Sequence, residues 1–357
     1  MTALAPVDGD AMLLGSESPL ARTYDVALLD LDGVCFAGDA RVDYAADSIN
    51  GARAHGMTLS FVTNNASRAP QAVVDKLSRN DIRASPDEVF SAAMDAAALL
   101  RERLAEGSPV LVVGGEGLRS ALAAEGFTVV ASADDRPAAV VQGWDPAVDW
   151  AMMSEGLYAI ADGALHVATN LDATLPTERG FALGNGSLVA AIANASGREP
   201  LAGGKPFPGI YERALARAGG SAPLAVGDRL NTDHVGARAA GIPGLHVLTG
   251  VSTARDVVLA RPEERPAYLH TDLRGLLEPH PRPVHERRGE ETEWIVGATH
   301  CRIHDDVVLL DDEVALTGRE AEITLNAYRA LACAMWDHLD RHAGAPAPSI
   351  PDIRVRA

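Results

Sequence analysis

Short apolar segments that end abruptly in polar residues recur between residues 24 and 280. Four of them are followed directly by aspartate, threonine or glycine: Val26–Leu29, Leu59–Val62, Leu224–Val226 and Leu245–Leu248. Each segment is rich in leucine or β-branched residues, is too short for a helix, and precedes a stretch of helical character. This pattern is typical of buried parallel strands, so we predict an α/β fold with a Rossmann-like parallel sheet.

The middle of the chain repeats the same alternation and is predicted to form a separate domain. The expected strands there are Val110–Val113, Ala139–Val141 and His166–Ala168. Because this block lies between the second and third polar strand ends, we predict a large α/β cap at residues 86–199, inserted into a core of residues 23–85 and 200–278. Gly114–Gly117 is interpreted as an ordinary strand-to-helix turn, with a nucleotide-binding glycine turn as the open alternative.

Outside this alternation the composition becomes rich in proline and in mixed charges. We predict a flexible tail at residues 1–22, a linker at 279–291, a small α+β extension at 292–343 and a second flexible tail at 344–357. The first tail lacks a basic leader and a long apolar segment, so it is not interpreted as a signal peptide. Within the extension we expect a hairpin at Trp294–Leu310 and a helix to about His342, started by a T-x-x-E capping box at Thr317–Glu320.

A net charge of −18 at pH 7 limits what the protein can bind. Such a surface repels nucleic acid and anionic membranes, and no apolar segment reaches the roughly 18 residues needed to span a bilayer. Cys35, Cys301 and Cys333 lie far apart and form no metal-binding pair, so we expect free thiols in a reducing compartment. We therefore predict a cytoplasmic protein without a nucleic-acid or membrane partner, and a homodimer stays open.

The first polar strand end is Asp30-Leu31-Asp32-Gly33. Two aspartates separated by one residue can converge on one pocket where a strand ends, and Gly33 allows the chain to turn there. One carboxylate can attack phosphorus, while the other can protonate the leaving oxygen and later deprotonate water. The same pattern is common in loops and calcium sites, so it indicates this chemistry only together with other segments.

Two further segments supply groups that an anion would need. Thr63, Asn64, Asn65 and Arg68 combine a hydroxyl, amides and a guanidinium just before a helix, as in many anion sites. The alternative is that Asn65 or Ser67 caps that helix, which could coexist with anion binding. Lys205 follows two glycines and can neutralise phosphate as a compact point charge, although a lone loop lysine is usually exposed.

The fourth segment, Gly227 to Asp233, places Asp228 at another strand end. Together with the first two aspartates it gives a hard oxygen site suited to Mg²⁺, which would offset repulsion between a carboxylate nucleophile and phosphate. Asp233, about one helical turn later, is expected to orient the metal ligands. The alternative is that Asp228 or Asn231 only caps the next helix.

The order of these segments, strand-D-x-D-G, strand-T-N-N, G-K-P and strand-G-D-x-x-x-T-D, resembles the haloacid dehalogenase-like phosphohydrolases. The insertion resembles the C2-type α/β cap of the NagD and p-nitrophenyl phosphatase-like branch, and residues 168–176 and 184–191 resemble a stretch of that cap. The resemblance covers residues 24–275. Cys35, Leu183 and Asn231 depart from the family pattern, but none of them removes a charge assigned to the metal ligands.

The resemblance implies a role for each of these residues. Asp30 would be the nucleophile and a Mg²⁺ ligand, Asp32 the acid and base that binds the metal through its carbonyl, and Asp228 a further metal ligand. The residues implied to bind phosphate or substrate are Thr63, Asn64, Asn65, Arg68, Lys205, Asn170, Asp172 and Leu175.

The implied activity is Mg²⁺-dependent hydrolysis of a small phosphorylated metabolite. The cap stretches and the C-terminal extension are most similar to those of actinobacterial glycerol 3-phosphate phosphatases, which suggests a role in glycerophospholipid metabolism. Nucleotides, pyridoxal phosphate and phosphoglycolate are alternative substrates, and Leu175 mildly disfavours pyridoxal phosphate because histidine is usual there. A non-catalytic phosphate-binding protein on the same fold is the alternative from another class.

Overall fold

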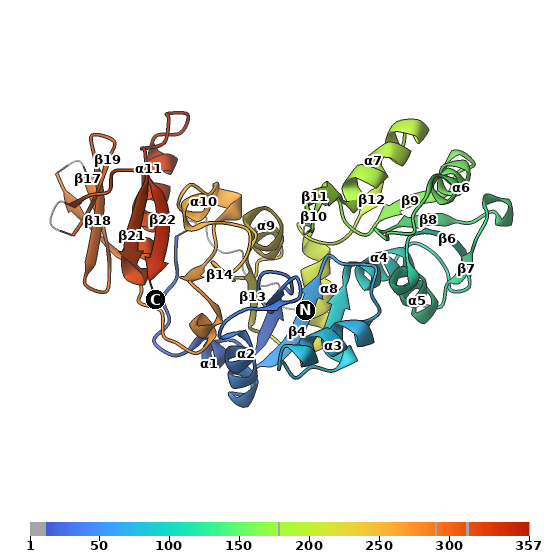
Figure 1. The fold of residues 1–357 in the computed structure, drawn as a ribbon, viewed down its shortest axis with the longest axis horizontal. Coiled ribbons are helices and arrows are strands. Elements are labelled where there is room, and N and C mark those ends of the chain that lie inside the picture. The colour runs from blue at the N-terminus through green and yellow to red at the C-terminus, as the bar shows by residue number, and fades with distance from the viewer. Residues whose placement is uncertain (1–11, 178, 290, 312–313, 357) are drawn as a thin grey trace. The chain divides into compact units, whose positions relative to one another are not determined.

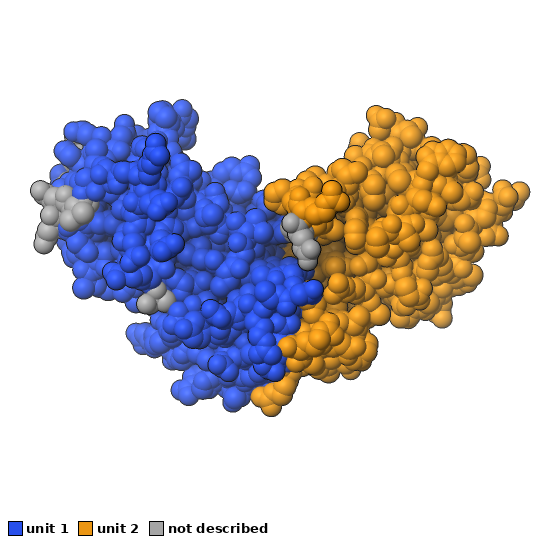
Figure 2. Space-filling view, in the orientation of Figure 1, with its two compact units in different colours: residues 1–59, 80–82, 218–357 blue, residues 60–79, 83–217 orange. Residues whose placement is uncertain are grey.

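A computed structural model of the chain describes residues 12–177, 179–289, 291–311 and 314–356. Figure 1 labels many of its helices and strands. The chain divides into two compact units, coloured separately in Figure 2. Unit 1 comprises residues 1–59, 80–82 and 218–357, and unit 2 comprises residues 60–79 and 83–217.

Unit 1 contains four parallel strands in the order β15–β14–β13–β1. Their bounds are Val26–Leu29 (β1), Pro223–Gly227 (β13), Gly244–Val247 (β14) and Tyr268–His270 (β15). Every residue of these strands is buried. Their apolar side chains explain why the sequence pattern located three of the four, and the prediction of an α/β fold with a parallel sheet is confirmed.

Helices and short turns connect the strands of unit 1. They are α1 (Leu20–Thr23), α2 (Ala45–Ala54), α9 (Val235–Ala239) and α10 (Ala254–Val258), with a small hairpin of β2 (Phe36–Ala37) and β3 (Ala40–Arg41). A π-helical segment, Leu230–His234, leads into α9. No helix in the described part of the chain is both long and apolar enough to cross a membrane.

Unit 2 contains a second parallel sheet with the strand order β12–β9–β8–β6–β7. The strands are Pro109–Val113 (β6), Thr128–Val130 (β7), Ala139–Gln142 (β8), Leu165–Ala168 (β9) and Leu201–Ala202 (β12). One apolar cluster of this sheet involves α4 (Ala92–Arg101) and α5 (Glu116–Ala124), and another involves α6 (Trp150–Ala161) and α7 (Asn185–Ser196). The strands that the sequence predicted in this block are confirmed.

Further segments complete unit 2. They are β4 (Thr58–Thr63), β5 (Val89–Ser91), α3 (Pro70–Arg79), α8 (Pro208–Ala218), and an antiparallel hairpin of β10 (Thr174–Thr177) and β11 (Gly180–Leu183). Residues 60–79 and 200–217 thus group with the inserted block, whereas the sequence assigned them to the core. The reason is a set of hydrogen bonds that joins these segments to the block and is described below.

Gly114–Gly117 is a close-packed strand-to-helix turn. A Cβ on Gly117 would come within 2.8 Å of backbone atoms of Ser67 and Arg68, and one on Gly114 would lie 2.9 Å from the Gly143 carbonyl oxygen. Close backbone approach therefore explains these two glycines.

The C-terminal part of unit 1 differs from the prediction in several places. It contains a five-stranded antiparallel sheet of β16 (Val284–Arg288), β17 (Glu291–Val296), β18 (Thr299–His304), β19 (Val307–Leu310) and β20 (Val314–Ala315). A strand therefore occupies residues that were predicted to be a linker. Two more strands, β21 (Glu320–Thr324) and β22 (Asp352–Arg356), pair in parallel, so the predicted flexible tail at 344–357 is also wrong.

Helix α11 spans Leu325–Arg341, and its N-cap is Thr324, whose hydroxyl accepts a hydrogen bond from the Ala327 N–H. The predicted capping box at Thr317–Glu320 is therefore wrong, because Glu320 begins a strand. The expected end near His342 is confirmed.

Residues 12–16 pack against the rest of unit 1, which contradicts the predicted flexible tail for this part of residues 1–22. Leu13 belongs to the core of unit 1, the Leu14 N–H donates to the Ala267 carbonyl, and Ser16 pairs with His280. Residues 1–11 lie outside the described part of the chain.

Candidate metal and phosphate site

The Asp30 loop forms because strand β1 ends in a tight turn. The Asp30 N–H continues the sheet by donating to the Val226 carbonyl at 2.9 Å, and the Cys35 N–H closes the turn on the Leu31 carbonyl at 2.8 Å. Gly33 has φ +89°, and a Cβ there would lie 2.6 Å from the Asp228 carboxylate. Glycine at position 33 thus permits both the backbone conformation and the approach of Asp228.

Asp228 follows β13 and is completely buried. Its Oδ2 accepts a hydrogen bond from the Val251 N–H at 2.6 Å, and its carbonyl accepts one from the Ser252 N–H at 3.0 Å. A Cβ on Gly250 would lie only 1.9 Å from Asp228 Oδ2. The loop after β14 therefore fixes the orientation of this carboxylate.

Asp233 is presented by the π-helical segment Leu230–His234, in which the Asp233 and His234 N–H groups both reach the Arg229 carbonyl. Such π turns occur often at functional sites. Asp233 is 1% exposed, and its Oδ2 accepts a hydrogen bond from the Arg229 N–H at 3.0 Å. The sidechain is thereby held against Gly227, where a Cβ would lie 2.3 Å from the Asp233 Cβ.

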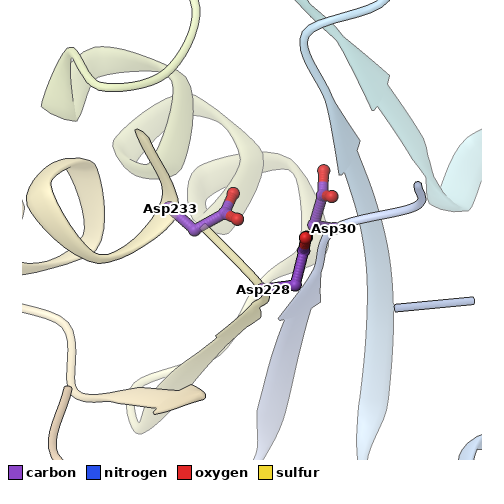
Figure 3. A group of neighbouring side chains, drawn as sticks. All are labelled: Asp30, Asp228 and Asp233. Carbon is purple, nitrogen blue, oxygen red and sulfur yellow. The ribbon is translucent and has the colours of Figure 1, made fainter. Parts of the chain in front are cut away.

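Asp30, Asp228 and Asp233 bring their carboxylate oxygens within 4.8 Å of one another (Figure 3). Three carboxylates this close repel one another unless a cation lies among them, and oxygen-only donors suit a hard divalent ion such as Mg²⁺. The residues therefore fit such a metal. Asp233, which the sequence assigned only an orienting role, lies as near as the other two, whereas the Asp32 side chain is exposed.

A second group of predicted residues lies in unit 2, around the Asn64 side chain. Asn64 Oδ1 accepts a hydrogen bond from the Lys205 N–H at 2.7 Å, and its Nδ2 donates to the Lys205 carbonyl at 2.9 Å and to Asp172 Oδ2 at 3.0 Å. Both N–H donors of the amide and one acceptor position of its oxygen are thus used inside the protein. The Asn64 side chain joins the Lys205 loop to the cap segment.

Lys205 is 3% exposed, unlike most loop lysines. Its Nζ donates to the Val62 carbonyl at 3.2 Å. Burial of an ammonium group is costly unless it meets acceptors or an anion, so the position of Lys205 is consistent with a functional cation.

The remaining residues of the Thr63 segment have local or exposed positions. Thr63 is 4% exposed, and its hydroxyl accepts a hydrogen bond from the Asn65 N–H. Asn65 Oδ1 accepts hydrogen bonds from the N–H and hydroxyl of Ser67 in a local turn, and the Arg68 side chain is exposed. Helix α3 begins only at Pro70, so neither Asn65 nor Ser67 is its N-cap and the capping alternative is wrong. Phosphate contacts by these residues stay predictions.

The three candidate residues of the cap have different surroundings. Asn170 Nδ2 donates to the Asn64 carbonyl at 2.8 Å, and Asn170 Oδ1 accepts from the Asp172 N–H at 3.1 Å. Leu175 is partly exposed on β10, opposite Ala182. The polar atoms of Asn170 and Asp172 therefore hold the Asn64 segment, and substrate contact by any of the three stays a prediction.

Two residues beside these groups were not identified as site residues from the sequence. Cys35, interpreted as packing, donates from Sγ to the Asp30 carbonyl at 3.3 Å. Asp95, on α4, is fully buried against the loop of Lys205. The sequence signal for Asp95 is an aspartate near the start of an alanine-rich segment, and it does not distinguish a functional residue from a helix-dipole partner.

Two family models match the chain: a haloacid dehalogenase-like hydrolase over residues 27–128 and a HAD-hydrolase-like family over residues 202–276. The chain belongs to the haloacid dehalogenase-like hydrolases, as the sequence resemblance predicted.

Individual relatives extend this similarity to most of the chain. A D-glycerol 3-phosphate phosphatase of Mycobacterium tuberculosis is 41% identical over 327 residues, which is 89% of this chain and 87% of that protein. A crystal structure of glycerol phosphate phosphatase from the same organism, in complex with magnesium, matches with a TM-score of 0.77 and 38% identity over 95% of this chain and 96% of that chain. A 5′-nucleotidase of Bacillus subtilis is 36% identical over 65% of this chain and 90% of its own length.

Proposed function

We propose that the protein is a Mg²⁺-dependent phosphatase that hydrolyses glycerol 3-phosphate through an aspartyl-phosphate on Asp30. The observation that carries the proposal is the group of three carboxylates formed by Asp30, Asp228 and Asp233. Similarity to a D-glycerol 3-phosphate phosphatase over 89% of the chain, including the C-terminal extension, supports the choice of substrate. The metal would neutralise charge on the carboxylates and on the phosphate oxygens.

In the proposed first step, Asp30 attacks phosphorus and the bond to the ester oxygen breaks. Asp32, whose side chain is exposed, gives its proton to the departing alkoxide. In the second step, Asp32 takes a proton from water, the water oxygen attacks phosphorus, and the bond to Asp30 breaks. Asp30 is thereby regenerated and inorganic phosphate is released.

We propose that Thr63, backbone N–H groups of the Asn64 segment and Lys205 bind the phosphate oxygens. Support comes from the burial of Lys205 and from the hydrogen bonds that fix the Asn64 side chain. Such preorganised donors can stabilise the charge that spreads over phosphate oxygens in the transition state. The Asn64 side chain itself would act by holding the loop.

Ester selection must come from groups outside the phosphate site, because that site contacts a moiety common to all these substrates. Leu175 on β10 is the candidate that we propose, since Asn170 and Asp172 direct polar atoms to the Asn64 segment and the Thr177 hydroxyl donates to the Gly180 carbonyl at 2.7 Å. None of these side chains is aromatic, so none can stack on a nucleobase or a pyridine ring. Selectivity from small pocket differences is typically about 10- to 200-fold.

The test compares purified protein on glycerol 3-phosphate, a nucleoside monophosphate, pyridoxal phosphate, phosphoglycolate and a sugar phosphate. Phosphate release is measured at steady state with millimolar Mg²⁺ and again after chelation. We expect the highest kcat/KM for glycerol 3-phosphate and loss of activity without the metal. A tenfold advantage for any other ester would overturn the proposed substrate, and no hydrolysis of any ester would overturn the proposed phosphatase activity.

We further propose a cytoplasmic location, supported by the three buried free cysteines.

A further inference from the structure

Asp95 is a buried carboxylate outside the motifs that define the family. It lies in the first turn of α4 and is 0% exposed. Its Oδ2 accepts a hydrogen bond from the Gly204 N–H at 2.8 Å, and its Oδ1 accepts one from the Arg213 guanidinium at 2.8 Å. One carboxylate therefore joins α4, α8 and the residue that immediately precedes Lys205.

The loop that Asp95 contacts has little room to adopt another position. A Cβ on Gly203 would lie 2.7 Å from Asp95 Oδ2, so glycine allows the loop to reach the carboxylate. Gly204 has φ +71°, and a Cβ there would lie 2.5 Å from the Thr169 carbonyl oxygen. The Gly204 N–H that donates to Asp95 is thus part of a backbone conformation that glycine permits and most other residues would strain.

Charge pairing keeps the carboxylate in place. Arg213 also donates to Glu102 Oε1 from Nε and from a terminal nitrogen, at 3.2 and 2.8 Å. Burial raises the pKa of Asp95, while the Gly204 N–H and the Arg213 charge act in the opposite direction. A buried carboxylate that lost either donor would be left with an unsatisfied oxygen, which is costly.

We propose that Asp95 is a positioning residue for Lys205. The Asp95 carboxylate, which Arg213 holds in place, accepts the hydrogen bond of the Gly204 N–H and thereby fixes the main chain of Lys205 for phosphate binding. The proposal rests on the function proposed above, in which Lys205 binds the phosphate. Asn64 holds Lys205 by its own N–H and carbonyl, and Asp95 holds the peptide just before it. The two contacts together define where the Lys205 main chain lies, and misplacement of a binding group by about 1 Å can cost about 100-fold in rate.

The experiment is a double-mutant cycle between Asp95→Asn and Lys205→Met in the full chain. The asparagine keeps the size of the side chain, but it can offer an oxygen to only one of the two donors. Two quantities are measured in the presence of Mg²⁺: kcat/KM for glycerol 3-phosphate and the affinity for inorganic phosphate by calorimetry. Urea unfolding of each variant separates a general loss of stability from a specific effect.

With Lys205 present, we expect Asp95→Asn to lower kcat/KM by about 10- to 100-fold and to weaken phosphate binding. In the Lys205→Met background the same substitution should change both quantities less than about threefold, because the group it positions is gone. Gly203→Ala displaces the loop from Asp95 without changing a charge, because the added Cβ would lie 2.7 Å from Asp95 Oδ2. This variant should therefore also weaken phosphate binding. It also provides a second test if Asp95→Asn does not fold.

Asp87→Asn is the matched control. Asp87 also pairs with an arginine of α8, Arg217, but its side chain is 96% exposed and the pair does not include the Lys205 loop. Activity within threefold of wild type for Asp95→Asn, or an equal loss in both Lys205 backgrounds, would overturn the proposal. If the wild type hydrolyses no ester, the proposed function fails, and the calorimetry with inorganic phosphate still decides the role of Asp95.

Discussion

Backbone N–H groups orient two of the three carboxylates of the proposed metal site. The donors belong to Val251 for Asp228 and to Arg229 for Asp233. A backbone donor adds no charge that would compete with a cation, and it cannot rotate away as a side chain can. The glycines beside these donors matter for the same reason, since they let neighbouring loops approach the carboxylates.

Gly250→Ala tests this account without changing any metal ligand. The added Cβ would fall 1.9 Å from Asp228 Oδ2, so either the carboxylate or the loop must move. We expect Mg²⁺ affinity to fall by about 10- to 100-fold, the range typical for groups that orient metal ligands. Calorimetry with Mg²⁺ measures the effect, and an unchanged dissociation constant would show that the Asp228 orientation tolerates the displacement.

Asp30→Asn tests the nucleophile. An amide is a poor nucleophile and a weaker metal ligand, so we expect turnover to fall by more than about 1000-fold while the circular dichroism spectrum stays the same. Asp39→Asn is the control, because Asp39 is an exposed aspartate in the nearby β2–β3 turn. A folded Asp30→Asn protein that retains a tenth of wild-type activity would remove Asp30 from the proposed role.

Asp30 and Asp228 could be predicted from the sequence because the signal for each lies in the residues directly before it. Asp30 and Asp228 directly follow apolar strands, and the ends of neighbouring parallel strands meet at one edge of a sheet. Asp95 and Gly250 could not be predicted in this way. Their importance depends on contacts with Gly204 and Asp228, which are 109 and 22 residues away in the sequence, and a single sequence shows no such pairing.

A helix or strand could be predicted from the sequence when its pattern of apolar and polar residues was distinctive. Buried strands such as Val26–Leu29 were located to the residue because all their side chains are apolar. The T-x-x-E motif at Thr317–Glu320 does not start a helix, because the residues that follow it form a strand. Residues 320–324 alternate between exposed and less exposed positions, as expected for the strand they form.

Helix α11 shows that the C-terminal extension is part of the core of unit 1. Trp336 is completely buried, and its indole N–H donates to the Val257 carbonyl of α10 at 2.9 Å. Arg265 lies shortly before β15 and forms a bidentate ion pair with Asp340, in which its two terminal nitrogens donate to the two carboxylate oxygens at 2.6 and 2.7 Å. Val257, Val258 and Leu269 share one apolar cluster with α11, so removal of the extension would expose them.

Trp336→Ala measures how much this interface stabilises the protein. Large-to-small substitution of a buried aromatic residue typically costs about 3–5 kcal/mol, so we expect a clear loss in urea unfolding experiments. Trp150→Ala is the control, because Trp150 is 80% exposed and its loss should change stability by less than about 0.5 kcal/mol. Equal stability of the two variants would show that the packing of Trp336 against α10 does not stabilise the protein.

At the scale of the whole molecule, each unit contains at least one histidine that burial holds in its neutral form. In unit 1, His280 donates from Nε2 to the Gly275 carbonyl at 2.8 Å, and its Nδ1 lies 3.2 Å from the Arg329 guanidinium. In unit 2, His166 contacts Gln142 Oε1 and is 5% exposed. The pKa of each histidine is lowered to about 4, mainly by burial, and the Arg329 charge contributes to the lowering at His280.

These pKa values predict how stability depends on pH. Between pH 6.5 and about 4 the unfolded chain protonates both histidines and the folded chain does not, so stability falls as the pH is lowered through this window. A shift from 6.5 to about 4 corresponds to about 3 kcal/mol per histidine over the full window. Above pH 6.5 the two histidines make their full contribution to stability. Most carboxylates protonate only near pH 4, at the lower end of this window.

Urea unfolding at several pH values between 7 and 4.5, for the wild type and for His280→Gln, measures this dependence. Glutamine can still donate to the Gly275 carbonyl but does not titrate, so the variant should lose less stability on acidification than the wild type, by about 2 kcal/mol at pH 5. His55→Gln, at an exposed histidine, is the control for the substitution itself and is measured at the same pH values. The same slope in His280→Gln and wild type would mean that His280 is not held neutral by its surroundings, since a group that titrates alike in both states cannot contribute to the pH dependence of folding.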